Sequence, residues 1–244
     1  MGNIDIWVPG RPNSYKEKNI KKPMQDIDLM QYQGLVKRSA KVAFLNARPF
    51  SSDVSLEITF QTALELDLIA AIKPVLNGLK GEVFIDDDAV RTLSVHINNQ
   101  GSVDAVLITV AQERSVAGGQ PRKTHSLSRR IHVPATPRVD QPPHSKMGEI
   151  LTIHDESNER AMTAIRASIG PSIEPLEGEI MVSMKIRTNE RKLDLDNVAH
   201  LYVAACQGFI FREMTQIKFF YMSFMSTEIF PGDEGIHMSF ATYH

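Results

Sequence analysis

The chain carries one motif twice, and an internal repeat constrains the fold more than any single element does. Residues 67–73 read DLIAAIK, an apolar stretch follows, and residues 84–88 read FIDDD. Residues 194–200 read DLDNVAH, again before an apolar stretch, and residues 209–213 read FIFRE. In each copy an acidic residue stands six positions before a polar side chain, Lys73 or His200. The same order of acid, apolar helix and second acid indicates a chain built from two equivalent units.

Hydrophobic periodicity predicts the same elements in both units, in the order strand, helix, strand, motif helix, strand, strand. In the first unit these fall at residues 4–8, 27–46, 54–62, 68–79, 93–97 and 106–110. In the second they fall at residues 130–133, 155–168, 179–187, 196–207, 219–223 and 237–241. Pro74 predicts a late start for the first motif helix, because proline is best tolerated in a first turn.

We therefore expect an α+β protein of two tandem domains, residues 1–113 and 129–244, packed together as an intramolecular pseudo-dimer. Residues 114–128 are rich in glycine, serine and basic residues, a composition typical of a linker. Whether two such chains associate again is left open by the sequence.

Composition restricts the compartment and the partners. No apolar run reaches the roughly 18 residues of a membrane helix, and the start lacks a signal-peptide pattern, so we expect a cytoplasmic protein without a membrane partner. The lone cysteine, Cys206, has the spacing of a buried core residue. The net charge is -2, yet basic residues gather near the start of the chain. Among them Arg11, Lys16 and Lys18 are candidates for phosphate contacts, the alternative being a solvated surface.

The acidic residues suit a hard divalent cation, which takes oxygen ligands from one or two carboxylates, water and phosphate. Asp194 and Asp196, two positions apart at a strand end, can share one ion. Asp67 would lie at the equivalent strand-to-helix junction. The structural alternative is that Asp194 or Asp196 caps the helix and that residues 86–88 form a solvated turn before a strand. Metal ligands must converge in space, whereas caps need not.

These residues resemble the RusA-like Holliday junction resolvases. That family has an Asp-x-Asp-Asn-x-x-Lys motif opening a helix and an Asp-Asp-x-Gln-[Val/Ile] motif opening the next strand. Residues 8–12, VPGRP, also resemble its opening loop. The resemblance spans residues 3–112 and, more weakly, 130–243. It implies Mg²⁺, or Mn²⁺ in its place, and a homodimeric mode of cutting four-way DNA junctions in recombination and repair.

Carried over to the first copy, the resemblance assigns the first motif position to Asp67, the lysine to Lys73, and the later acidic pair to Asp86 and Asp87. Ile69 and Ala70 replace the second aspartate and the asparagine.

In the second copy Asp194, Asp196 and Asn197 match the first motif, and His200 replaces the lysine. Glu213 stands for the first acid of the later pair, with Met214 at the second. Gln216 and Ile217 follow in register. Each copy thus lacks part of the set.

Three functional hypotheses follow. In the first, a Mg²⁺-dependent endonuclease works through Asp67, Asp86 and Asp87 of the first half, and Lys73 stabilises charge on the phosphate. The second half would hold metal through Asp194, Asp196 and Glu213 without a lysine. In the second hypothesis, the complementary losses reflect one composite site shared by the halves. In the third, the chain is a pseudo-dimer that binds branched DNA without cutting it. His200 is a further candidate for the site.

Overall fold

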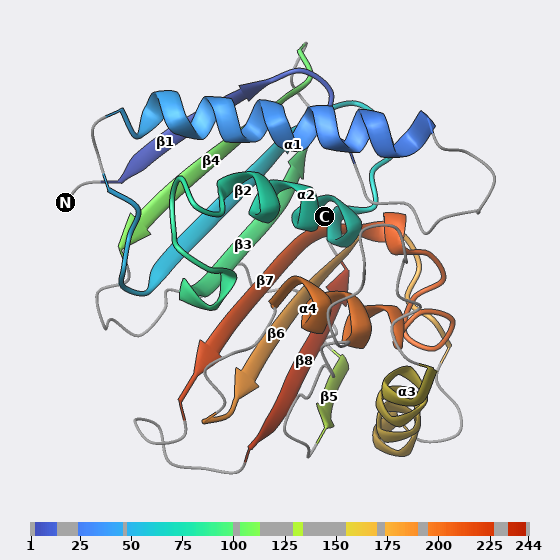
Figure 1. The fold of residues 1–244 in the computed structure, drawn as a ribbon. Coiled ribbons are helices and arrows are strands. Elements are labelled where there is room, and N and C mark those ends of the chain that lie inside the picture. Colours follow the sequence, from blue (N-terminus) through green and yellow to red (C-terminus); the bar gives the residue numbers. More distant parts are fainter. Residues whose placement is uncertain are drawn as a thin grey trace.

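The computed structural model describes residues 3–13, 24–45, 48–99, 103–112, 129–133, 155–169, 174–189, 195–226 and 234–242. Within these ranges the fold is α+β, as the sequence predicts: eight strands form a single sheet, accompanied by four α-helices. Helices α1, α2 and α4 lie across one face of the sheet, and α3 lies beside the edge strand β5 (Figure 1).

The element order matches the expected one. The first half contains β1 (Ile4–Pro9), α1 (Met24–Ala43), β2 (Val54–Gln61), α2 (Leu68–Leu79), the 3-10 turn η1 (Asp87–Ala89), β3 (Val90–Asn98) and β4 (Ala105–Gln112). The second contains β5 (Arg129–Val133), α3 (Asp155–Ile169), β6 (Ile180–Arg187), α4 (Leu195–Ala204), η2 (Met214–Gln216), β7 (Ile217–Met225) and β8 (Gly235–Thr242). The expected linker, residues 114–128, lies outside the described residues.

The strand order is β1-β4-β2-β3-β7-β6-β8-β5, so the second half repeats the order of the first in reverse across the sheet. In each half the two strands nearest the centre of the whole sheet are parallel, β2 with β3 and β6 with β7. The halves meet where β3 and β7 pair antiparallel. Both halves therefore share one continuous sheet, and their chains run in opposite directions through it.

Local irregularities also recur in both halves. The register of β2 and β3 skips Arg91, and the register of β6 and β7 skips Lys218. Gly81 and Gly208 both have positive φ, 81° and 82°, a conformation that a side chain disfavours. Each glycine N–H donates to the carbonyl oxygen three residues later, at 2.8 and 2.7 Å. The two turns that follow the motif helices thus have the same backbone path.

The bounds of α2 agree with the range 68–79 that periodicity predicts, whereas the late start inferred from Pro74 is wrong. The helix begins at Leu68, one residue after its N-cap Asp67, and Pro74 lies inside it. An interior proline loses a hydrogen bond and costs about 3 kcal/mol. All residues of α2 except Lys73 and Asn77 are buried, and burying an aliphatic side chain contributes about 1.5–3 kcal/mol. Apolar burial along α2 therefore outweighs the effect of the proline.

Close packing of α1 holds α2 against the sheet. Gly78 of α2 faces Val36 of α1, and a Cβ built at Gly78 would lie 2.6 Å from the Val36 Cβ. Real carbon atoms do not approach this closely, so only glycine permits this separation of the helices.

Two predictions from composition can be compared with the structure. Cys206 is buried, as expected, and its Sγ donates to the Tyr202 carbonyl oxygen at 3.3 Å. Burial raises the pKa of the Cys206 thiol to about 12, which makes it a poor nucleophile. Among the described helices, none combines the length and the apolar character needed to cross a bilayer.

Candidate composite site

The two motifs of the first half lie at opposite ends of α2. Asp67 precedes the first residue of this 12-residue helix, and η1 follows the turn after its last residue. At a rise of 1.5 Å per residue the helix is about 18 Å long. Asp67 and Asp87 are therefore too far apart to share one ion, and the structure does not bring the first copy's acids together.

The antiparallel pairing of β3 and β7 turns the second half around, and α4 packs against α2. As a result the start of α4 faces Lys73. The Lys73 Nζ donates to the Asn197 Oδ1 at 2.9 Å and lies 3.5 Å from the Asp196 Oδ2. These contacts join positions 124 residues apart in the sequence. The lysine of one copy thus meets the Asp-Asn pair of the other.

Asp87 completes this group. Burial raises the pKa of its carboxyl to about 6; nearby Asp196 adds to the rise, whereas Lys80 and Lys73 oppose it. One of its oxygens, Oδ1, is buried without a hydrogen-bond partner, and the other lies 3.9 Å from the Lys80 Nζ. We call Lys73, Asp87, Asp196 and Asn197 the composite site, since the first two come from one half and the last two from the other.

The electrostatics of the composite site are unusual for a structural cluster. Asp196 is a charged residue only 7% exposed, and the Lys73 ammonium lies beside it. The carboxylate of Asp87 is desolvated without full hydrogen-bond compensation. A buried polar atom without a partner costs about 1–3 kcal/mol. Such unfavourable groups concentrate at functional sites, where a ligand satisfies them.

The internal repeat gives each residue of the composite site an equivalent in the other half of the chain. We call these four equivalents the counterpart positions, and nearly all of them are apolar. Where the composite site has Asp196 and Asn197, they have Ile69 and Ala70, which are 2% and 5% exposed. Met214 stands in place of Asp87 and packs against the core. His200 stands in place of Lys73 and is half-buried. The motif residues that are replaced in the two copies therefore all belong to the counterpart positions, and the composite site keeps its polar residues.

Two further acids from the sequence prediction have structural partners. The Asp67 Oδ1 accepts a hydrogen bond from the Ala70 N–H at 3.0 Å and caps α2. The exposed Asp86 accepts from the Asp87 N–H at 2.8 Å and forms an ion pair of 2.6 Å with Lys80. Both residues have the roles of caps. Lys80, which the sequence analysis did not single out, links Asp86 to Asp87.

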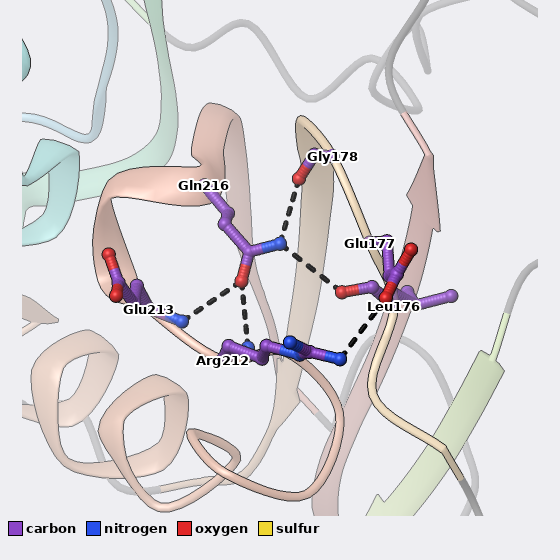
Figure 2. Close-up of polar contacts among 6 residues, drawn as sticks. All are labelled: Leu176, Glu177, Gly178, Arg212, Glu213 and Gln216. Atoms are coloured by element: carbon purple, nitrogen blue, oxygen red, sulfur yellow. Dashed lines mark hydrogen bonds and ion pairs between the residues drawn. The ribbon is translucent and has the colours of Figure 1, made fainter.

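Glu213 lies at the start of η2, in a turn organised by Gln216 (Figure 2). The Gln216 Oε1 accepts from the backbone N–H groups of Arg212 and Glu213 at 2.7 and 2.9 Å. Its Nε2 donates to the carbonyl oxygens of Leu176 and Gly178 at 3.2 and 2.8 Å. The glutamine of the second motif therefore ties this turn to the chain that enters β6, and its role is structural.

The remaining predicted residues lie away from the composite site or outside the described part. Arg11 is exposed and follows β1, the edge strand of the sheet. Lys16, Lys18 and Asp194 lie outside the described residues.

The oxygen ligands of the composite site fit a Mg²⁺ ion. In the described part of the chain no three Asp, Glu, His or Cys side chains group closely enough to form an all-protein metal site. Mg²⁺ commonly uses only one or two carboxylates and completes its shell with water and substrate phosphate. Asp87 and Asp196 supply two carboxylates, Asn197 supplies an amide oxygen, and the Asp87 Oδ1 has no other partner.

A scan against protein-family models and a search of curated proteins give no match to this chain. The candidate site is therefore supported by its geometry and by the repeated motif.

Proposed function

We propose that the chain is a pair of tandem RusA-like domains, folded as an intramolecular pseudo-dimer, that hydrolyses a phosphodiester bond in branched DNA at one composite Mg²⁺ site. The observation that carries this proposal is the contact of Lys73 with Asp196 and Asn197 across the two halves, with Asp87 beside them.

The tandem-domain part is supported by the repeated order of strands, by matching bulges at Arg91 and Lys218, and by matching turns at Gly81 and Gly208. Unrelated units rarely share irregularities at equivalent places, because bulges are specific features retained within families. The antiparallel centre of the sheet is the arrangement expected of two copies related by a twofold rotation.

Each residue of the composite site has a chemical role in this proposal. Asp87, Asp196 and the Asn197 amide oxygen would hold Mg²⁺, which when bound supplies Lewis-acid charge to a phosphate. Lys73 would stabilise negative charge that develops on the phosphate oxygens during attack by water. The half-buried setting strengthens both interactions, since charges attract more strongly where water is excluded.

One site per chain implies one incision per binding event. The counterpart positions offer Ile69, Ala70 and Met214, none of which can bind a hard cation through its side chain. A paired, symmetrical cut requires two matched sites. The chain alone should therefore nick one strand of a branched substrate.

A branched-DNA-binding protein without nuclease activity is the second candidate. It is favoured by the small number of acids at the composite site, where the described residues provide two carboxylates. In that case Lys73 would neutralise Asp196 permanently, and the surface would bind phosphates without cleaving them.

Cleavage of a labelled four-way junction, with linear duplex as control, tests the proposal in Mg²⁺ and in EDTA. Asp87→Asn and Asp196→Asn should each reduce the rate at least about 100-fold, the usual effect of losing one essential electrostatic group. Asp67→Asn is the matched control, because asparagine caps a helix as well as aspartate does. It should cut like the wild type.

Three results would count against the composite site. Loss of cleavage in Asp67→Asn alone would assign activity to the first copy's own acids. Linear product from a cruciform plasmid, instead of a nicked circle, would contradict a single site per chain. Tight junction binding without Mg²⁺-dependent cleavage would favour the second candidate.

A further inference from the structure

The sheet has one face on which no helix in the described part of the chain is packed. Helices α1, α2 and α4 cover the other face (Figure 1). Side chains alternate between the faces along each strand, so every second residue points away from the helices. We call this surface, formed by the outward side chains of all eight strands, the open face.

The sheet is mixed: five of its strand pairs are antiparallel and two are parallel. Sheets in which antiparallel pairs predominate can leave one face exposed to water. The open face also has apolar character along one row of paired residues, which crosses the sheet as Trp7, Leu107, Thr59, His96, Phe219 and Met181. Trp7 is 50% exposed. This row would gain from being covered.

Charge is unevenly distributed over the open face. Its first-half end carries the exposed acids Asp5 and Glu57. Its second-half end carries a basic group that comprises Arg130, His132, Lys185, Arg187 and His237. Burial lowers the pKa of His237, and repulsion from His132, Arg187 and Lys185 lowers it further. These four residues therefore lie close together. The His132 and His237 rings stack with centroids 4.2 Å apart.

From this pattern we infer that the open face binds the open face of a second copy of this chain. A twofold axis parallel to the central strands β3 and β7 places the acidic end of each copy over the basic end of the other. In that arrangement Asp5 faces Arg130 of the second copy, and Glu57 lies near its Lys185. The apolar rows of the two copies meet in the middle and exclude water.

The area is sufficient for a stable dimer. The six inner strands have eight or nine residues each. With strands about 4.8 Å apart and about 3.3 Å per residue, they present a surface of about 29 by 26 Å, or roughly 750 Å². Standard protein interfaces bury about 800 Å² on each partner. Two such sheets would pack face to face about 10 Å apart, as in a β-sandwich.

Sedimentation equilibrium of the full chain tests this inference without DNA, so its result is independent of any nuclease activity. We expect a monomer–dimer equilibrium between about 1 and 100 µM. Glu57→Lys and Lys185→Glu should each weaken association by about tenfold, because each opposes like charges at two symmetrical places. The double variant should restore it. Within one chain these residues are three strands apart, about 14 Å, so direct coupling inside the monomer is small.

The control is Lys41→Glu, an exposed charge reversal on α1, on the other side of the sheet. It should leave the association constant unchanged. A chain that stays monomeric over the whole range would overturn the inference and leave the open face to a different partner. A dimer that neither single reversal weakens, or that the double variant does not restore, would place the dimer interface elsewhere.

Discussion

Removing the cation from the composite site should destabilise the protein more than removing its buried anion. Lys73 and Asp196 are 3.5 Å apart, and their side chains are 36% and 6% exposed. At an effective dielectric constant of about 20, two unit charges at this distance attract by about 4.7 kcal/mol. Because Lys73 is partly exposed, solvent screening reduces this energy, and we expect about 2–3 kcal/mol for Lys73→Met.

The asymmetry follows from burial. Lys73→Met leaves a charged Asp196 in a site with little access to water, and an unpaired buried charge is costly. Asp196→Asn leaves a lysine that can turn its ammonium group into solvent, so we expect a loss of only about 1 kcal/mol. In the double variant Lys73→Met/Asp196→Asn, the loss should be smaller than the sum of the two single losses.

Urea unfolding at about pH 7.5 in EDTA measures these differences, with Lys37→Met as the matched control. The Lys37–Glu82 pair is of similar length, 3.7 Å, but its side chains are 57% and 24% exposed. Exposed pairs contribute less than about 1 kcal/mol, so Lys37→Met should cost little. If Lys37→Met cost as much as Lys73→Met, or Asp196→Asn cost more than Lys73→Met, the reasoning from burial would be refuted.

Three further predictions concern the scaffold. Gly78→Ala should lower the free energy of unfolding by about 1–3 kcal/mol through overpacking, whereas Gly34→Ala, with its nearest neighbour 3.5 Å away, should raise it by up to about 1 kcal/mol in urea titrations. Burial lowers the pKa of His96, so the folded state binds fewer protons there than the unfolded state. Stability should therefore fall as the pH drops below about 6.5, and His96→Gln should reduce this fall when unfolding is compared at pH values above and below that point. Gln216→Ala removes four hydrogen bonds and should lower the melting temperature by several degrees in calorimetry, while an unchanged value would show that the turn at η2 forms without it.

Much of the fold could be predicted from the sequence, because the repeat and the period-2 strands determine the order of elements. The late start inferred from Pro74 is wrong because proline affects local propensity, whereas burial along α2 depends on tertiary packing that no local signal contains. The meeting of Lys73 with Asp196 was anticipated only as one of several arrangements. It depends on the antiparallel pairing of β3 with β7, a contact between halves that the sequence pattern does not specify. The sequence suggests a capping role for Asp194 or Asp196 and a solvated turn for residues 86–88. The caps formed by Asp67 and Asp86 are known only from the structure.

The separation of 124 positions between Lys73 and Asn197 sets the earliest time at which the composite site can exist in a cell. A ribosome adding about 5–20 residues per second needs about 6–25 s to make the intervening chain. During that interval the first half can begin to fold while its lysine and acids lack their counterparts. A nascent chain that has not yet reached residue 197 would therefore hold no assembled site, and whatever chemistry the site performs becomes available only after the second motif has been synthesised.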